Sequence, residues 1–183
     1  MPHSGTNTSF RELVEQELIR ISEIDRSEEI LEQYVVVNGK LVLSSCSISS
    51  SGFDPKELAE IIGRQHKILE QKGFVFGAFN GEKLIGVASL ENRKRGAQHD
   101  YLKMDILYVS NTYRVKGVGS QLLNNCKEKA LRLGAEKLYV SATPTQTTVD
   151  FYLKHGATLT SEIDSELYKL EPDDIHLELS LLV

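Results

Sequence analysis

The sequence predicts one mixed α/β (α+β) domain in which antiparallel hairpins precede a strand–helix–strand unit. Asn-Gly pairs at positions 38–39 and 80–81 each separate two apolar, β-prone runs, which predicts two hairpins. Farther along, the apolar run 102–110, the periodic segment 118–130 and the run 137–142 predict parallel strands joined by a helix. We therefore expect a mixed, mostly antiparallel sheet flanked by helices, with one central parallel strand pair.

The N-terminal end is expected to hold a tail followed by a helix. Residues 1–9 are small and polar without a hydrophobic region, which predicts a flexible tail rather than a secretory signal. Apolar residues recur at helical spacing over 10–22, which predicts an amphipathic helix. We expect residues 10–183 to form a single domain, because this length suffices for one hydrophobic core.

A second helix is predicted between the two hairpins. Asp54 is the expected cap, Pro55 the first helical residue and Glu57 the acidic partner of a capping box. Gly73 is expected to end this helix. The serine-rich residues 44–52 that precede it are interpreted as a spacer rather than as a mobile loop over a site.

The C-terminal part is expected to add a short helix and two strands. Residues 143–146 read Thr-Pro-Thr-Gln, a capping-box sequence that predicts a helix from position 144 to about position 155. Strands are predicted over 157–160 and 175–182. The acidic segment between them is expected to be an exposed connection.

Composition limits the classes of partner. The net charge of -5 and the pI near 5.6 argue against nucleic acid, which normally requires a basic face. The sequence has no apolar run long enough to cross a membrane. Cys46 and Cys126 fit two free thiols in a cytoplasmic protein, and the five histidines show no metal-ligand spacing, so we expect no metal.

The chemistry concentrates at one strand-to-helix turn, Arg114-x-x-Gly117-x-Gly119. Positions 115–118 are Val, Lys, Gly and Val, so no side chain there can cap the first helical turn. Free N–H groups, the positive end of the helix dipole and the charges of Arg114 and Lys116 therefore converge on a site for an anion, most naturally a phosphate. The alternative is a tight turn that binds nothing.

Two other phosphate-binding motifs do not fit the residues. A dinucleotide fingerprint would need a third glycine at position 122, which is Leu. A Walker loop would need Gly-Lys-Ser or Gly-Lys-Thr, which does not occur.

The turn resembles the acyl-CoA signature of the GCN5-related N-acetyltransferase (GNAT) superfamily, which reads Arg or Gln, two residues, Gly, one residue, then Gly or Ala. Phe151 and Tyr152, followed by Gly156, resemble the second motif of the superfamily, an aromatic residue, Tyr, three residues and Gly. The two matches lie within residues 102–160. The resemblance implies a GNAT-like twisted sheet and acetyl-CoA as co-substrate.

The resemblance also implies a binding role for the turn and for the strand before it. The backbone N–H groups of residues 115–120 are expected to hold the pyrophosphate of acetyl-CoA, and the main chain of the strand its pantetheine arm. The expected cofactor-binding residues are Leu107, Val109, Arg114, Val115, Lys116, Gly117, Val118, Gly119 and Ser120. Thr145 and Ala157 stand where the superfamily often has Asn and Phe, so contacts at these two places are expected to differ.

Two side chains are candidates for catalysis. Tyr152 matches the general-acid tyrosine of the superfamily, and a thiol of pKa about 8.5 can take a proton from a tyrosine of pKa about 10. The alternative for Tyr152 is a core aromatic residue. Asp105 lies two residues before Leu107, so we expect it on the same strand face, where it accepts the proton of the amine or instead pairs with a basic neighbour such as Lys103. Its ordinary pKa of about 3.9 makes it a poor direct base unless it is desolvated.

The resemblance implies an enzyme that transfers an acetyl group from acetyl-CoA directly to a primary amine of a small molecule or peptide. A non-catalytic acyl-CoA-binding sensor or interaction domain is the alternative. The acceptor pocket is expected from residues 22–34, 44–53 and 91–101, and the identity of the amine and a homodimer are left open.

Overall fold

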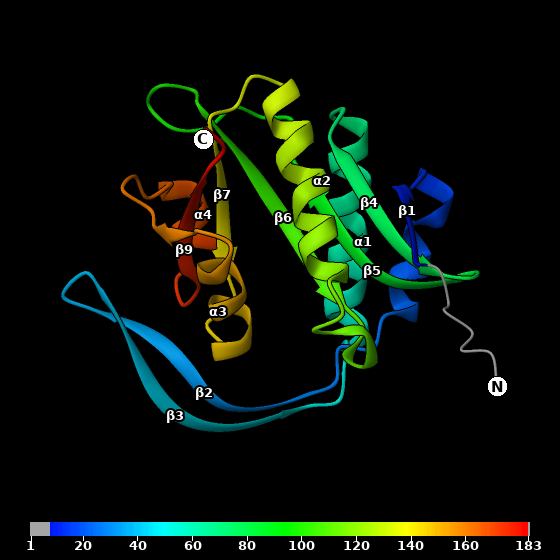
Figure 1. Ribbon diagram of the computed structural model, residues 1–183, viewed down its shortest axis with the longest axis horizontal. Helices are drawn as coiled ribbons and strands as arrows, with labels where there is room; N and C mark the ends of the chain where they lie inside the picture. Colours follow the sequence, from blue (N-terminus) through cyan, green and yellow to red (C-terminus); the bar gives the residue numbers. More distant parts are fainter. Residues whose placement is uncertain (1–7, 183) are drawn as a thin grey trace.

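The computed structural model describes residues 8–182, which form a seven-stranded sheet and a separate two-stranded arm (Figure 1). In chain order the elements are β1 (Thr8–Glu12), η1 (Glu15–Glu23), β2 (Glu28–Val37), β3 (Lys40–Ser50), α1 (Pro55–Glu70), β4 (Phe74–Asn80), β5 (Lys83–Leu90), β6 (Tyr101–Val109), η2 (Asn111–Tyr113), α2 (Val118–Arg132), β7 (Lys137–Ala142), α3 (Gln146–Lys154), β8 (Thr158–Leu159), α4 (Ser165–Leu170) and β9 (Ile175–Ser180). The sheet has the order β1-β4-β5-β6-β7-β9-β8, and only the β6–β7 pair is parallel. The predicted mixed sheet with a central parallel pair is confirmed.

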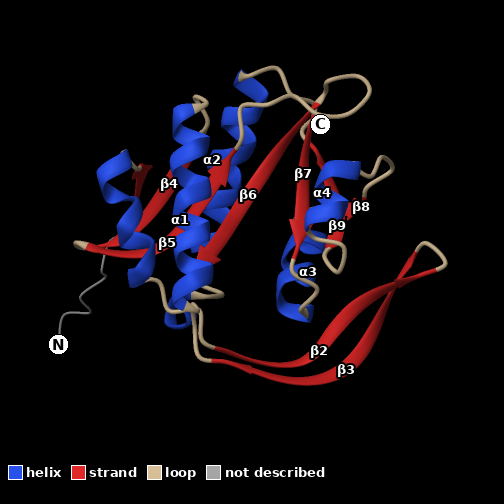
Figure 2. Cartoon of the chain, turned by 180° about the vertical axis from the view of Figure 1, so that it is seen from behind, coloured by secondary structure: helices blue, strands red, loops and turns tan. Residues whose placement is uncertain are grey.

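Two apolar clusters cover the two faces of the sheet. On one face, α2 and α3 contribute Leu122, Leu123 and Val149 to the larger cluster. On the other face, η1 and α1 contribute Leu18 and Ile61 to a second cluster. Figures 1 and 2 accordingly show α1 and α2 on opposite sides of β4, β5 and β6. We call these two sides the α2 face and the α1 face.

β6 and β7 run together only over their first halves. Their pairing begins at Tyr101 with Lys137 and ends at Met104 with Val140. Beyond this point the two strands diverge, as Figure 1 shows. Among the described residues, no strand pairs with β6 on this side over 105–109.

A β-bulge lies where the strands part. Met104 and Leu107 of β6 pair with residues of β5 that are only two positions apart, so Asp105 and Ile106 together face Ser89. Such a bulge bends the strand and increases its twist. It therefore helps to turn the second half of β6 away from β7.

The N-terminal prediction is wrong in its first part. Instead of a helix over 10–22, the chain forms strand β1, which pairs with β4, and then the 3₁₀ helix η1. The pairing explains this result, because β1 covers the open edge of β4 with backbone hydrogen bonds that a helix could not supply. Most of the expected tail, residues 1–9, lies outside the described residues, but Thr8 and Ser9 belong to β1.

The first hairpin is longer than predicted. Its strands pair from Glu28 with Ser50 up to the turn at Asn38, so most of the serine-rich segment 44–52 is strand and not a spacer. The hairpin forms the arm that extends beside α3 in Figure 1. Tyr34 anchors it there, because its hydroxyl donates a 2.8 Å hydrogen bond to Asp150.

The C-terminal helices also differ from the prediction. α3 is capped by Thr145, which accepts a hydrogen bond from the backbone N–H of Thr148, and not by the residue two positions earlier. The acidic segment expected to be an exposed connection contains α4, and its Leu167 is buried. This single anchor is too weak a periodic signal to predict a helix from the sequence.

Gly86 sets the distance between β5 and the start of α2. A Cβ atom at this position would lie 3.0 Å from Leu122 Cδ1 and 3.2 Å from Val118 Cγ1. The backbone oxygen of Tyr108 would also lie 3.2 Å away. The missing side chain therefore lets the first turn of α2 pack directly on the sheet.

We predict that Gly86→Val lowers the free energy of unfolding by about 1–3 kcal/mol, because the added atoms overpack this contact. Urea denaturation measures the change. Gly63→Ala is the matched control, since its Cβ meets no atom within 4 Å in the exposed part of α1. The control is expected to raise stability by up to about 1 kcal/mol, and a stable Gly86→Val variant would show that the close approach is no constraint.

Candidate active site

Helix α2 begins without a side-chain cap, as the sequence predicted. Gly117 is its N-cap residue, has a φ of 82° and makes no side-chain capping hydrogen bond. Val115 is also left-handed, with a φ of 56°, and its side chain is fully exposed. A β-branched residue rarely adopts this conformation, so the turn stores backbone strain of the kind found at ligand sites. Left-handed residues in such turns direct N–H groups toward a common concavity that suits an anion.

The two cations of the turn play different parts. The Arg114 guanidinium lies 3.2 Å from a carboxylate oxygen of Glu28, and its Nε donates to the backbone oxygen of Val109 at 3.3 Å. Arg114 therefore ties the arm to the end of β6. The Lys116 ammonium forms no ion pair with any residue of 8–182 and lies 5.2 Å from the ring centroid of Tyr113.

The open edge of β6 presents the main chain that the sequence singled out. The N–H of Ser110 donates to Ile85 of β5 at 2.8 Å. Backbone groups alternate in direction along a strand, so those of Val109 and Leu107 point away from β5, toward the side where β7 has diverged. An extended ligand there would pair with β6 as an added strand.

The first turn of α2 and the end of α3 meet at the same place. A Cβ on Gly119 would lie 3.2 Å from the ring of Phe151, so glycine permits close packing of the two helices. The His155 ring nitrogens lie 2.7 Å from the backbone oxygen of Phe151 and 2.9 Å from Ser120 Oγ. Since the carbonyl only accepts, Nδ1 carries a proton there. The two motifs of the sequence are thus joined in space.

Tyr152 lies on the α2 face and is only 4% exposed. Burial raises the pKa of its phenol, with smaller contributions from Cys126 and Tyr108. Its hydroxyl therefore keeps its proton at neutral pH. Tyr152 is both a core aromatic and a candidate acid, so the alternative drawn from the sequence does not exclude the catalytic one.

Asp105 lies on the α1 face, within a set of charges and hydrogen bonds. Its side chain is 3% exposed, with Lys103 Nζ at 2.8 Å and Arg64 Nε at 3.3 Å from its two oxygens. The amide of Gln65 donates to it at 2.8 Å. Burial pushes the pKa of Asp105 upward, but the charges of Lys103 and Arg64 and these hydrogen bonds hold it below its ordinary value. The pairing with Lys103 that the sequence left open is therefore what the structure shows.

The expectation that Asp105 shares a strand face with Leu107 is wrong. Leu107 packs on the α2 face, whereas Asp105 contacts residues of α1. The bulge is the cause, because it adds one residue between them and reverses the alternation of faces.

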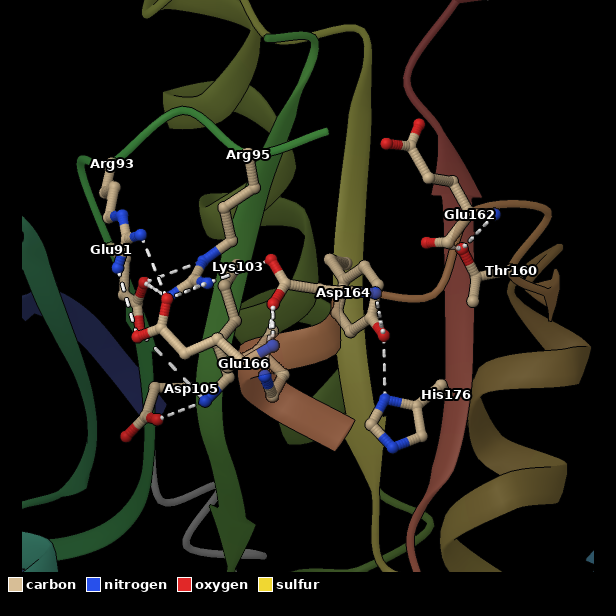
Figure 3. A network of polar contacts seen from close by, with 12 residues as sticks. Glu91, Arg93, Arg95, Lys103, Asp105, Thr160, Glu162, Asp164, Glu166 and His176 are labelled. Carbon is tan, nitrogen blue, oxygen red and sulfur yellow. Dashed lines mark hydrogen bonds and ion pairs between the residues drawn. The ribbon is translucent and has the colours of Figure 1, made fainter. Parts of the chain in front are cut away.

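A chain of ion pairs leads from Asp105 across the α1 face, as Figure 3 shows. Lys103 Nζ lies 2.8 Å from Asp105 Oδ1 and 4.0 Å from Glu91 Oε1. Glu91 in turn lies 2.9 Å from Nη2 of Arg95, whose Nη1 lies 3.0 Å from Asp164 Oδ2.

The chain of ion pairs ends at the cap of α4. Asp164 accepts hydrogen bonds of 3.0 Å from the backbone N–H groups of Glu166 and Leu167. α4 leads directly into residues 171–174. The ion pairs therefore fix the position of α4 and of residues 171–174, which line a pocket on the α1 face.

A pocket of about 340 Å³ opens on the α1 face beside the open edge of β6. It is lined by residues of α1, by Tyr108 of β6, by Thr143 after β7 and by residues 170–174. Of the three segments expected to build an acceptor pocket, only 22–34 contributes, through Arg26. Residues 171–174 could not be predicted as part of a pocket, because an acidic connection usually is a solvated face.

The pocket carries an excess of negative charge. Five carboxylates and two arginines line it. Both arginines are engaged, Arg26 with Glu57 at 3.0 Å and Arg64 with Asp105 at 3.3 Å. The remaining carboxylates give the pocket a potential that favours a cation.

Residues 8–182 contain no helix that is long and apolar enough to cross a membrane. Within the same range, no three His, Cys, Asp or Glu side chains are grouped so that they could hold a metal ion.

The chain matches a protein-family model over more than half of its length. The model of the acetyltransferase (GNAT) family matches residues 43–157. This segment runs from β3 through α3 and includes β6, the turn and Tyr152. No curated protein sequence matches the chain.

Comparison with solved structures finds the same fold in several acetyltransferases. Nourseothricin acetyltransferase has a TM-score of 0.72 at 18% identity, covering 96% of this chain and 99% of its own. A protein from Bacillus anthracis assigned as a streptothricin acetyltransferase, solved with acetyl coenzyme A, has a TM-score of 0.70 at 20% identity, covering 95% and 98%. The PaiA N-acetyltransferase of Thermoplasma acidophilum, solved with coenzyme A, has a TM-score of 0.62 at 16% identity, covering 95% and 99%.

We predict that Asp105→Asn lowers the free energy of unfolding at pH 7 by about 3 kcal/mol, because it removes the nearer counter-charge of the buried Lys103 and leaves only Glu91 at 4.0 Å. The folded-state pKa of Asp105 lies below its unfolded value, so the wild-type advantage is complete above about pH 4. It is lost as the pH falls through the folded-state pKa.

Urea denaturation between pH 3 and pH 7 tests this. Glu15→Gln is the control, since the Glu15–His66 pair is exposed and is expected to contribute less than about 1 kcal/mol. Equal stability of Asp105→Asn and wild type at pH 7 would contradict the structural role.

Proposed function

The chain belongs to the acetyltransferase (GNAT) family, and we propose that it transfers the acetyl group of acetyl-CoA directly to a primary amine of a small molecule or peptide. The observation that carries the proposal is the place where β6 leaves β7. There an uncapped helix, an open strand edge, a buried tyrosine and an acidic pocket come together.

The residues present suit acetyl-CoA as the donor. The free N–H groups of residues 115–120, together with Lys116, offer a site for the pyrophosphate. The backbone groups of Leu107 and Val109 offer hydrogen bonds to the amide-containing arm. The likeness to structures solved with acetyl coenzyme A and coenzyme A is in keeping with this donor.

Within the expected binding set, we propose different roles for two residues. We propose that Arg114 acts by holding the end of β6 and the arm, since its guanidinium already binds Val109 and Glu28. Val118 is buried against the sheet, so only its backbone N–H is available to a phosphate. Val115, Lys116, Gly117, Gly119 and Ser120 remain the proposed phosphate-binding residues.

The acceptor is proposed to enter from the pocket on the α1 face. An ammonium group suits its carboxylates, and the pocket borders the segment of β6 that would hold the thioester. A backbone N–H on this strand would polarise the thioester carbonyl as charge develops on its oxygen. The two substrates would thus approach the open edge of β6 from opposite faces.

Tyr152 is proposed to donate a proton to the sulfur that leaves. Its pKa is raised by burial, which makes the phenolate costly. Burial also destabilises a thiolate formed in the same region, so transfer of the proton from the Tyr152 phenol to the sulfur remains favourable. Asp105 is proposed to hold Lys103 and α1 in place, because its lowered pKa makes it a weak base.

The direct experiment follows free thiol release from acetyl-CoA in the presence of a panel of amines. Turnover with a cationic amine supports the proposal. Tight binding of acetyl-CoA without thiol release would instead support an acyl-CoA sensor, and failure to bind acetyl-CoA would contradict both. A cytoplasmic location and a homodimer remain predictions from the sequence.

We predict that Tyr152→Phe lowers kcat by about 100-fold or more, the usual contribution of general acid catalysis. The Kd for acetyl-CoA should change less than about twofold, because the aromatic ring remains. Steady-state kinetics and calorimetry measure the two quantities. Tyr168→Phe, at an exposed tyrosine of α4, is the matched control and should leave both unchanged. Full activity of Tyr152→Phe would remove Tyr152 from the mechanism.

We predict that Gly117→Ala weakens acetyl-CoA binding about tenfold, since a side chain in the left-handed conformation costs about 1–2 kcal/mol and the turn relaxes to avoid it. Gly134→Ala is the matched control, because Gly134 has a similar φ of 74° at the other end of α2. Both variants should lose similar stability, but only Gly117→Ala should bind acetyl-CoA less tightly. Equal Kd values for the two would contradict the phosphate site.

A further inference from the structure

We propose that Asp174, in the pocket on the α1 face, accepts the proton that the acceptor amine must lose before it attacks. The inference rests on the proposed N-acetyltransferase function and adds a catalytic residue to it. It assigns to the segment after α4 a role that the sequence attached to Asp105.

The need for such a group follows from the acceptor. An alkyl ammonium has a pKa of about 10.4, so at neutral pH almost all of it is protonated and cannot attack a carbonyl carbon. Asp105 is poorly placed to help, because both of its carboxylate oxygens already accept from Lys103, Gln65 and Arg64.

Asp174 has the position that Asp105 lacks. It lines the pocket together with Tyr108, which belongs to the open segment of β6. Asp174 is half-buried. Its backbone N–H donates a 3.3 Å hydrogen bond to the backbone oxygen of Glu171, and this bond bends residues 171–174 into a turn. No hydrogen bond from the described residues contributes to the titration of its carboxyl group.

The charges around Asp174 favour its neutral form at mildly acidic pH. Burial, together with the negative charges of Glu171 and Asp173, raises its pKa to about 6 against the opposing charge of Lys103. The other charged or titratable groups of the pocket are Arg26, Glu57, Glu60, Arg64 and Tyr108. A base with a pKa near 6 is ionised at neutral pH and is a better proton acceptor than an ordinary aspartate.

Glu171 provides a second, independent observation at the same place. Its Oε2 atom is buried and has no hydrogen-bond partner among the described residues. Because no described residue neutralises this oxygen, Glu171 adds a negative potential beside Asp174 that attracts an ammonium group in the pocket. We therefore expect Glu171 to hold the ammonium beside Asp174.

The acetyl transfer begins at the bound ammonium group. The ammonium gives one proton to the Asp174 carboxylate, and the free nitrogen forms a bond to the thioester carbonyl carbon. The C–S bond breaks, and the sulfur takes a proton from Tyr152. The second proton of the nitrogen leaves as the amide forms and restores Tyr152 through solvent. The products are the amide, the thiol and one proton, which Asp174 releases to solvent.

The test is the pH dependence of kcat/KM for wild type and Asp174→Asn with an amine that the wild type acetylates. The kcat/KM of the wild type should fall about tenfold per pH unit below about pH 6, because the protonated carboxyl group of Asp174 cannot accept a further proton. Asp174→Asn should be at least about 100-fold slower at pH 7. Its rate should instead rise with pH toward the amine pKa of about 10.4, because only the free amine then reacts.

Two further variants separate proton transfer from structure. Glu70→Gln is the matched control, since Glu70 is an exposed carboxylate of α1 that does not line the pocket, and it should keep kcat within about twofold of wild type. The acidic limb is the part of the pH profile in which kcat/KM falls toward low pH. Glu171→Gln should move this acidic limb to lower pH, because the loss of a neighbouring negative charge lowers the pKa of Asp174. A merely structural role would leave the limb in place.

The outcomes distinguish the inference from the function on which it rests. Wild-type turnover with an unchanged profile in folded Asp174→Asn overturns the inference alone. An unchanged limb in Glu171→Gln does so even where Asp174→Asn fails to fold. Absence of turnover with every amine, despite acetyl-CoA binding, overturns the proposed function and the inference together.

Discussion

The divergence of β6 from β7 is the constraint on which the rest of the structure depends. Parallel pairing ends at Met104, and the next residues of β6 have no strand partner on that side among the described residues. Unpaired backbone groups inside a sheet are costly unless a partner or water satisfies them. In the proposed function, an extended ligand would satisfy them and receive its orientation from the strand. The apolar α2 face and the acidic pocket border the same few residues of β6.

The opening must be held, since two parallel strands otherwise gain by pairing along their full length. The bulge at Asp105 and Ile106 turns β6 away, and the buried contacts of Asp105 fix that bulge to α1 and to Lys103. From Lys103 the ion pairs continue to the cap of α4. A chain of buried charges is a poor source of stability, but each member fixes the position of the next. The same contacts that keep the sheet open thus place the segment that ends in Asp174.

The sequence predicted what depends on neighbouring residues. The Asn-Gly hairpins, the Asp54 cap and the uncapped start of α2 all follow from a few adjacent side chains and are confirmed. The predictions that were wrong concern features that depend on partners distant in the chain. β1 is a strand because it pairs with the edge of β4, and Asp105 lies on the other face of the sheet because of a bulge. The left-handed Val115 goes against its own preference, so no local rule predicts it. Residues 171–174 read as solvated acids because nothing local shows that a pocket covers them.

In the proposed mechanism, the separation of the two faces lets one small site carry out two opposite proton transfers. The amine must lose a proton to a group whose pKa lies below its own, whereas the sulfur must gain one from a group that holds it firmly at neutral pH. Burial raises the pKa of both side chains, Asp174 and Tyr152. For the carboxyl group the rise produces a usable base, and for the phenol it preserves a neutral donor. In this proposed mechanism, the sheet stands between Asp174 and Tyr152, so the proton that Asp174 accepts and the proton that Tyr152 donates take separate paths, and the two reactants would meet at the open edge of β6.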